Sequence, residues 1–264
     1  MLHIQRILGK MRRAIEDYKM INDGDKIAVG VTGGKDSLVL LMGLGRLRDF
    51  LPVRFDIEAI TIDMGLDNTD FSPIQEICEN LRINWTLEKT VIGKIVFDIR
   101  KEQNPCSMCA NLRRGALNNA AVRLGCNKTA LGHNNDDVVE TFMLSLLLEG
   151  RVHTFSPVTW LDRKQIHVIR PLIYIEEREI KGVINRYGIT TVNSQCTVAG
   201  KTKRYSIREL LRELTNEYGD VKGRIFGAIT RSGIDGWKPA GSRDSRKSCM
   251  DLPNKQDKEP SGTN

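Results

Sequence analysis

Two adjacent glycines, a lysine, an aspartate and a serine follow a short apolar run near the start of the chain. They form the string T-G-G-K-D-S directly after a β-branched stretch that contains Ile27, Val29 and Val31. Such a stretch is typical of a buried strand, and the apolar residues after Ser37 recur at helical spacing. In a strand–turn–helix unit, the backbone N–H groups of the turn and of the helix N-terminus point at an anion. The string therefore predicts a phosphate-binding loop. Its members are Thr32, Gly33, Gly34, Lys35, Asp36 and Ser37.

This loop differs from the P-loop of ATPases and GTPases. The P-loop pattern is G-x-x-x-x-G-K-[ST], whereas only three residues separate Gly30 from Gly34, and Lys35 is followed by Asp36. The string matches S-G-G-x-D-S, the pyrophosphate-loop signature of enzymes that cleave ATP between the α- and β-phosphates. Thr32 replaces the first serine and keeps a hydroxyl. A glycine turn without a ligand is the simpler alternative, but the full string after a strand favours nucleotide binding.

Strand and helix patterns alternate on both sides of the loop. Predicted strands cover residues 27–31, 55–64, 85–92, 128–133, 168–172 and 189–192. Predicted helices cover residues 106–124, 136–148, 176–187, 203–218 and 221–231. A further helix is expected after residue 71, with Ser72 as N-cap, Pro73 at the first position and Gln75 completing a capping box. The alternation predicts an α/β fold with a doubly wound, mostly parallel sheet.

Polar residues gather where the predicted strands end. Ligands of such sheets bind at the carboxyl ends of the strands, so these residues are expected to meet the nucleotide held by the loop. They are Asp63, Gly132, His133 and Asp137.

Asp136 and Asp137 also stand where a helix begins. An N-cap role would explain one of the two acids. Two carboxylates beside a phosphate loop also suit Mg²⁺, which binds carboxylates together with nucleotide phosphate oxygens. We favour the magnesium interpretation, with Asp36 as a further ligand.

Six cysteines are scattered along the chain, and two of them form a C-x-x-C pair. Cys106 and Cys109 stand at a predicted helix start, so both sulfurs can face one point. The pair could be a redox couple, half of a zinc site, part of an iron–sulfur site or two small core residues. Cys196, taken alone, is more typical of a buried small residue. Packing, turn or tail positions are expected for Cys78, Cys126 and Cys249.

Composition and charge indicate a globular protein with a polyanionic partner. The 264 residues are 40% hydrophobic and 28% charged, with a net charge of +7 and a pI near 9.1. Residues 1–22 predict an amphipathic helix and not a secretory signal, and the most apolar run, residues 142–148, is too short to cross a bilayer. We therefore expect no membrane partner and a cytoplasmic location, where thiols stay reduced.

The expected organisation has four parts. The helix of residues 1–22 precedes an ATP-binding domain at 23–200, a basic helical appendage at 201–231 and a disordered tail at 232–264. A solvated helix face would explain the basic residues of the appendage, but RNA phosphates are their other expected partner. These residues are Lys201, Lys203, Arg204, Arg208 and Arg212.

Taken together, the motifs resemble the tRNA 2-thiocytidine synthetase family of pyrophosphate-loop enzymes, from about residue 15 to residue 231. They are T-G-G-K-D-S, P-C-S-M-C-A-N-L-R-R-G-A-L, A-L-G-H-N-N-D-D, V-I-R-P-L and a late cysteine before a basic helix. In that family three cysteines hold an iron–sulfur cluster, and the matching residues are Cys106, Cys109 and Cys196. The chain departs from the family at Thr32 and at Asn193, where a cysteine is usual.

The resemblance implies an adenine nucleotide alpha hydrolase-like fold and a tRNA-thiolating sulfurtransferase that forms AMP and pyrophosphate. A cytidine carbonyl in the anticodon loop would be adenylated by ATP with Mg²⁺, and sulfide on the open iron of a [4Fe–4S] cluster would then displace AMP. Arg113 and Arg114 would bind RNA near the cluster. The implied partners are tRNA and a sulfur donor, either a cysteine desulfurase or free sulfide, with a homodimer left open. The catalytic residues would be Asp36, Cys106, Cys109 and Cys196.

Two alternatives remain at this stage. A lysidine synthetase uses the same loop to adenylate the same carbonyl but attacks with lysine, and it needs no cysteine trio. The second alternative is a non-catalytic nucleotide- or zinc-binding module that binds RNA and uses the T-G-G-K-D-S loop only to detect a nucleotide.

Overall fold

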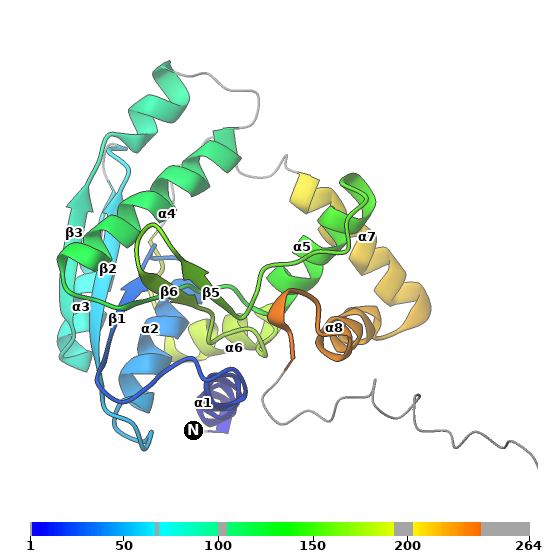
Figure 1. Ribbon diagram of the computed structural model, residues 1–264, viewed down its shortest axis with the longest axis horizontal. Coiled ribbons are helices and arrows are strands. Elements are labelled where there is room, and N and C mark those ends of the chain that lie inside the picture. The colour runs from blue at the N-terminus through cyan, green and yellow to red at the C-terminus, as the bar shows by residue number, and fades with distance from the viewer. Residues whose placement is uncertain (1, 67–68, 100–104, 193–202, 239–264) are drawn as a thin grey trace, which may run out of the picture.

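A six-stranded sheet forms the centre of the molecule, with the strands in the order β3–β2–β1–β4–β6–β5 (Figure 1). The computed structural model describes residues 2–66, 69–99, 105–192 and 203–238. The strands are β1 (Asp25–Gly30), β2 (Phe55–Asp63), β3 (Asn84–Lys89), β4 (Lys128–Ala130), β5 (Val158–Leu161) and β6 (Ile166–Ile169). All neighbouring strands are parallel except β5, which runs antiparallel to β6. The predicted doubly wound, mostly parallel α/β sheet is confirmed.

Helices cover both faces of this sheet. They are α1 (Leu2–Asp17), α2 (Lys35–Leu47), α3 (Ser72–Leu81), α4 (Pro105–Arg123), α5 (Asn135–Leu148), α6 (Glu177–Tyr187), α7 (Lys203–Tyr218) and α8 (Val221–Ser232), with a π-helix at Lys94–Ile99 and a 3₁₀ turn at Ile234–Gly236. Alternate residues of β1 face opposite layers: Ala28 packs with Leu117 and Ala120 of α4, whereas Ile27 and Val29 belong to the main core. Among the described residues, none of these helices is long and apolar enough to cross a membrane.

The winding of the sheet reverses at β1. From this strand the chain adds β2 and β3 on one side and β4 and β6 on the other. Ile27 pairs with Ile57 of β2 and with Lys128 of β4. A crevice forms at the carboxyl ends of strands where their order reverses. The loop after β1 and the segment after β4 therefore lie beside each other at this crevice.

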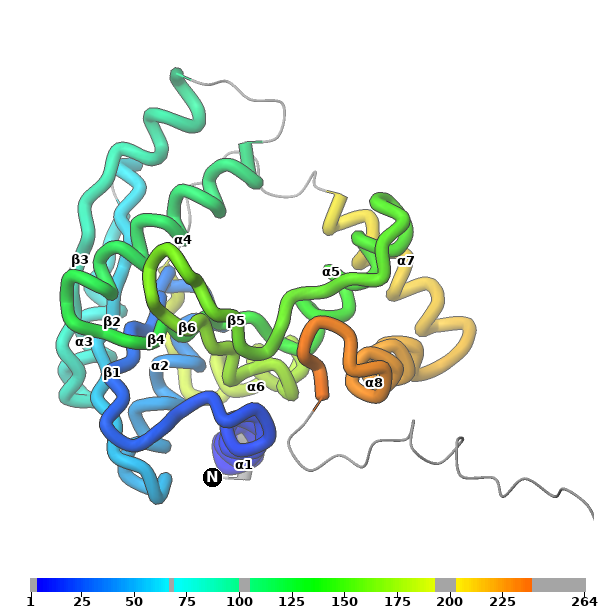
Figure 2. Tube along the Cα trace, in the orientation of Figure 1, coloured from blue at the N-terminus to red at the C-terminus, as the bar shows by residue number. Residues whose placement is uncertain are grey.

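The three helices α5, α7 and α8 lie together on the side of the molecule away from β3 (Figure 2). Val139 and Met143 of α5 form a small apolar core with Ile207 and Leu211 of α7. The two C-terminal helices predicted at 203–218 and 221–231 are confirmed as helices. They are attached to the rest of the protein mainly through α5.

The predicted disordered tail is wrong at its beginning. Trp237 is fully buried, and its Nε1–H donates a hydrogen bond to the carbonyl oxygen of Phe155 (2.8 Å). Its ring also packs edge-on against Tyr18 and Phe226. One large aromatic side chain thus holds residues 233–238 against the core, despite their polar composition. The remainder of the predicted tail, residues 239–264, lies outside the described residues.

Two further local predictions are wrong. The N-cap of α3 is Phe71 and not Ser72, whose N–H and hydroxyl both donate to Asp70 (2.9 and 3.0 Å), while Gln75 donates to Glu79.

Residues 189–192 form no strand, and a strand at β5 was not predicted. Because β5 lies at the edge of the sheet, only one of its sides is paired, and its residues show no buried alternation.

Candidate active site

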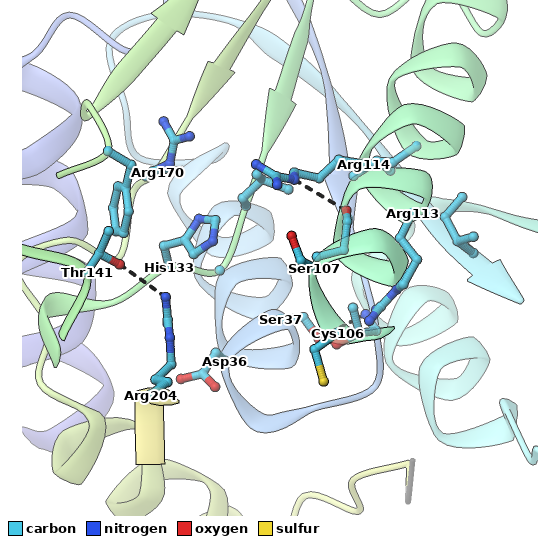
Figure 3. Close-up of a pocket in the computed structure, with 18 of the residues that line it drawn as sticks. Asp36, Ser37, Cys106, Ser107, Arg113, Arg114, His133, Thr141, Arg170 and Arg204 are labelled. Atoms are coloured by element: carbon cyan, nitrogen blue, oxygen red, sulfur yellow. Dashed lines mark hydrogen bonds between the residues drawn. The ribbon is translucent and has the colours of Figure 1, made fainter. Parts of the chain in front are cut away.

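One cavity lies at the carboxyl ends of the central strands, where the order of the strands reverses. Its volume is about 1170 Å³, and its walls come from the phosphate loop, the segment after β4 and the first turns of α4 and α7. Figure 3 shows side chains from these elements, among them Asp36, His133 and Arg204, around a common space. The cavity therefore occupies the position where the sequence predicts a nucleotide.

Gly33 has a backbone conformation that other residues adopt only with strain. Its φ is +78°, and a Cβ atom there would lie 2.4 Å from the Cβ atom of Val192. The N–H of Val192 also donates a hydrogen bond to the carbonyl oxygen of Gly33 (3.0 Å). Residues 189–192 therefore pack on the phosphate loop instead of joining the sheet, and the absence of a side chain at Gly33 permits this contact.

The hydroxyl of Thr32 takes part in the internal hydrogen bonds of the loop. Its Oγ1 accepts from the N–H of Gly34 (3.3 Å) and lies 3.2 Å from the Oγ atom of Ser37. Ser37 in turn accepts from the N–H of Thr32 (3.1 Å) and donates to the carbonyl oxygen of Gly34 (2.8 Å). These contacts need a hydroxyl but not a serine, which explains why threonine serves at this position.

Gly132 allows the segment after β4 to approach the start of α2. A Cβ atom at Gly132 would lie 3.1 Å from the carbonyl carbon of Asp36 and 3.2 Å from the backbone nitrogen of Ser37. Two residues farther on, the Nδ2 group of Asn134 donates to Oδ1 of Asp36 (2.8 Å). The two segments are thus joined directly, as their predicted common role requires.

Two residues that were predicted to bind the nucleotide have other contacts. Lys35 pairs with Asp36 (2.8 Å) and with Glu177 of α6 (3.0 Å). Burial acts to lower the pKa of Lys35, but hydrogen bonds to the two carboxylates outweigh it and raise that pKa. Asp63 accepts from the N–H of Gly65 (2.9 Å). Neither Lys35 nor Asp63 lines the cavity.

Asp137 is held near the loop by both of its oxygens. Oδ2 accepts from the backbone N–H of Asn134 (3.0 Å) in a capping box, and Oδ1 accepts from Nη1 of Arg204 (2.9 Å). Burial raises the pKa of Asp137 to about 6, although the bonds from Asn134 and Arg204 act in the opposite direction, and the charge of Asp36 adds to the rise. The N-cap of α5 is Asn134, so neither acid has the predicted N-cap role, and Asp137 completes the capping box from the third helical position.

Asp136 does not lie beside the phosphate loop. Its Oδ1 accepts from Lys222 (2.7 Å) and its Oδ2 from the backbone N–H of Glu177 (2.7 Å). It lines a second cavity, which lies among α6, α7 and α8. These two bonds tie α5 to α8 and to the first turn of α6. The binding of Mg²⁺ by Asp136 stays a prediction.

The C-x-x-C pair stands in the first turn of α4. Cys106 is exposed and lines the cavity, and Cys109 is half-buried with its Sγ atom 3.5 Å from Sδ of Met64. Cys78 and Cys126 are buried, and burial raises their pKa values to about 12 and about 11, in agreement with packing roles. Within the part of the chain that the structure describes, no three His, Cys, Asp or Glu side chains form a metal site. Cys196 and Cys249 lie outside that part.

The basic residues predicted to contact RNA fall into two groups. Arg113, Arg114, Lys203 and Arg204 line the cavity. Arg208 and Arg212 line the second cavity instead, and Lys201 lies outside the described residues.

Two of these arginines form ion pairs that fasten α7 to α5. Arg204 bonds to Asp137 and to Oγ1 of Thr141 (3.1 Å), while Arg208 bonds to both oxygens of Glu140 (2.7 and 3.2 Å). Both arginines thus have carboxylate partners in this structure, and their contact with RNA phosphates stays a prediction.

A family model described as a PP-loop domain matches residues 4–215. The chain belongs to the PP-loop family. Its relatives include proteins named tRNA-cytidine(32) 2-sulfurtransferase. That of Pelobacter propionicus is 37% identical over 229 residues, which cover 86% of this chain and 85% of the relative. That of Geobacter sulfurreducens is 37% identical over 231 residues, which cover 86% and 90%. The predicted membership of the tRNA 2-thiocytidine synthetase family is confirmed, and the chain is an enzyme of the sulfurtransferase class.

A solved structure shares the fold. The U34-tRNA thiolase of Methanococcus maripaludis, determined with its [4Fe-4S] cluster, matches with a TM-score of 0.68 over 85% of this chain and 77% of that chain, at 23% identity. At this identity, the likeness confirms the predicted fold alone.

Two residues in or beside the PP-loop cavity were not predicted from the sequence. Asn134 follows His133 in the same motif, and its amide orients Asp36. Arg170 directly follows β6 in the string V-I-R-P-L and lines the cavity beside Phe155. Arg170 could have been recognised from the sequence, because it is a charged residue directly after an apolar strand. Arginine is rarely buried in such a position unless it has a partner.

Proposed function

We propose that this chain converts a cytidine of tRNA to 2-thiocytidine, with ATP as the activating substrate. The observation that carries the proposal is that the PP-loop and Cys106 line one cavity. The α-phosphate of ATP and a sulfur donor could therefore reach the same base. The name of the relatives supports tRNA and cytidine as substrates.

The reaction needs activation because oxide is a poor leaving group from the 2-position of cytosine. The carbonyl oxygen would attack the α-phosphorus of ATP, and pyrophosphate would leave. Sulfide would then form a bond to the ring carbon as the carbon–oxygen bond breaks and AMP departs. Backbone N–H groups of Gly33 and Gly34 and of the first turn of α2 would bind the phosphate oxygens while their charge grows.

The residues at the cavity fit the two inorganic groups that this chemistry uses. Thiolates are the ligands of iron–sulfur clusters, and Cys106 and Cys109 stand on one helical turn at the cavity. With Cys196 they would hold a [4Fe–4S] cluster that supplies the sulfide. Asp36 and Asp137 offer carboxylate oxygens near the loop, so they would hold Mg²⁺ against the phosphates.

The target base would have to leave its stack to enter the cavity, so a single-stranded anticodon loop is the proposed substrate. Arg113, Arg114 and Lys203 would bind its phosphates. The role proposed for Lys201 is the same. We further propose a cysteine desulfurase or free sulfide as the sulfur source, a cytoplasmic reaction and a second copy of the chain as a candidate partner.

Anaerobic reconstitution tests the proposal. Purified protein is given tRNA, ATP, Mg²⁺, sulfide and lysine, and the nucleosides are analysed by mass spectrometry. We expect brown, iron- and sulfide-containing protein and formation of 2-thiocytidine. Cys109→Ala should lose both colour and product, whereas the matched control Cys78→Ala, at a buried packing position, should keep both.

The rival functions give different results in the same assay. Activity that survives Cys109→Ala and adds the mass of lysine indicates a lysidine synthetase. Colourless protein with one zinc and no AMP formation indicates a binding module. Either result would remove the thiolation proposal.

A further inference from the structure

Arg170 carries a buried positive charge at the end of β6. Only 6% of the residue is exposed. Its Nη1 group donates to the carbonyl oxygen of Ser156 (2.6 Å) and to Oγ1 of Thr159 (3.0 Å), and its guanidinium carbon lies 5.1 Å from the ring centre of Phe155. These contacts fix the plane of the guanidinium. None of these three partners carries a negative charge.

The Nε atom of Arg170 is buried and has no hydrogen-bond partner among the described residues. No ion pair between described residues includes this arginine either. A buried charge costs free energy unless a counter-ion compensates it. Burial, followed by the charge of Arg114, lowers the pKa of Arg170 to about 10, which reflects the same missing anion.

His133 shares this environment. Its ring lies 4.8 Å from that of Phe155, and its Nδ1 atom is also buried without a partner among the described residues. Burial, followed by three nearby arginines, lowers the pKa of His133 to about 3, so the ring is neutral at working pH. The three are Arg170, Arg204 and Arg114.

The side chains that line the cavity carry an excess of positive charge, which also favours an anionic ligand. Asp36 is the single acid among the described lining residues, and it is already bonded to Asn134 and Lys35. Five lining residues are basic. In Figure 3, Arg170 and Asp36 lie on opposite sides of His133, so the unpaired cation stands away from the PP-loop.

We propose that Arg170, together with Arg114 and His133, forms a second phosphate subsite in this cavity, distinct from the PP-loop. The Nε–H of Arg170 would donate to a phosphoryl oxygen, and the guanidinium would supply the charge that the protein does not neutralise itself. The subsite belongs to the proposed function and rests on it, because the two substrates of that function are the two sources of phosphate. One is the pyrophosphate end of ATP, and the other is the RNA phosphodiester beside the target base.

Binding experiments on the full chain separate these sources. The variants are Arg170→Met, Arg170→Lys and the control Arg163→Met, which changes an exposed arginine in the turn between β5 and β6. One assay measures the affinity for ATP and for inorganic pyrophosphate without RNA. The other measures tRNA affinity as a function of salt.

The two sources predict different losses for Arg170→Met. If the anion belongs to the nucleotide, pyrophosphate affinity should fall about tenfold or more while the salt slope of RNA binding is unchanged. If it belongs to RNA, tRNA affinity should fall and the salt slope should decrease by about 1, with ATP affinity unchanged. The control should match the wild type in both assays.

The subsite is overturned if folded Arg170→Met binds pyrophosphate and tRNA within twofold of the wild type. If that variant does not fold, Arg170→Lys replaces it, because lysine keeps the charge but lacks the Nε–H donor. Wild-type affinities for Arg170→Lys would then overturn the Nε–H contact on which the proposed subsite is built. Neither assay requires sulfur transfer, so failure of thiolation would leave this test intact.

Discussion

Replacement of Arg208 by methionine should loosen the contact between α7 and α5. Nε of Arg208 donates to Oε1 of Glu140 (2.7 Å) and Nη2 donates to Oε2 (3.2 Å). Only 1% of the Glu140 side chain is exposed. Methionine keeps much of the apolar stem of arginine, so the main effect of the change is to leave a buried carboxylate without its principal counter-ion.

The magnitude follows from the surroundings of this pair. Removal of one partner from a fully buried ion pair costs about 3–5 kcal/mol. Here the Arg208 side chain is 43% exposed, and Nη1 of Arg204 lies 3.9 Å from Oε2 of Glu140, so water and a second arginine compensate in part. We therefore expect the free energy of unfolding to fall by about 2 kcal/mol.

Urea denaturation followed by circular dichroism measures this loss. The matched control is Arg212→Met on the same helix, whose 68% exposed side chain pairs with Glu209 and should contribute less than about 0.5 kcal/mol. The double variant Arg208→Met, Glu140→Leu should recover most of the loss, because it removes the unpaired carboxylate. Small and equal losses for Arg208→Met and Arg212→Met would refute the reasoning and return Arg208 to the RNA-binding role inferred from the sequence.

Three other changes have defined outcomes. Gly33→Ala should weaken ATP binding at least about tenfold in a titration, because its positive φ and the Cβ atom of Val192 exclude a side chain, whereas Gly115→Ala, with open space around it, should not. Trp237→Ala should reduce the free energy of unfolding by about 3–5 kcal/mol in urea; an unchanged midpoint would mean that the residue does not anchor the C-terminal segment. Asp137 has a folded pKa of about 6, above its usual 3.8, so its contribution to stability is greatest below pH 4 and declines toward pH 6. Mg²⁺-dependent ATP binding should strengthen as the pH rises through about 6, and Asp137→Asn should remove that dependence.

The PP-loop could be predicted from the sequence because its determinants are local. Hydroxyls, glycines and the following helix all lie within a few residues, and the hydrogen bonds between Thr32, Gly34 and Ser37 close inside the same string. The sheet could be predicted for a similar reason, since strand and helix periodicities alternate along the chain. The strand expected at residues 189–192 shows the limit of such patterns. The β-branched Val192 packs on Gly33 and its N–H donates to the carbonyl oxygen of Gly33, so these residues contact the loop and form no strand.

The order of residues is enough to recognise the chemistry that the chain can support: an ATP loop, a cysteine pair and an excess of positive charge. Which of these charges a ligand can reach depends on how the helices pack. Arg204 and Arg208 find carboxylates 67 and 68 residues away, and Asp136 is bonded to Lys222, whereas Arg170 is buried without an acid among the described residues. The number of charged residues can be read from the sequence, but whether a charge has a partner depends on distances between segments that are remote in the chain. Those distances exist only after the helices have packed around the sheet.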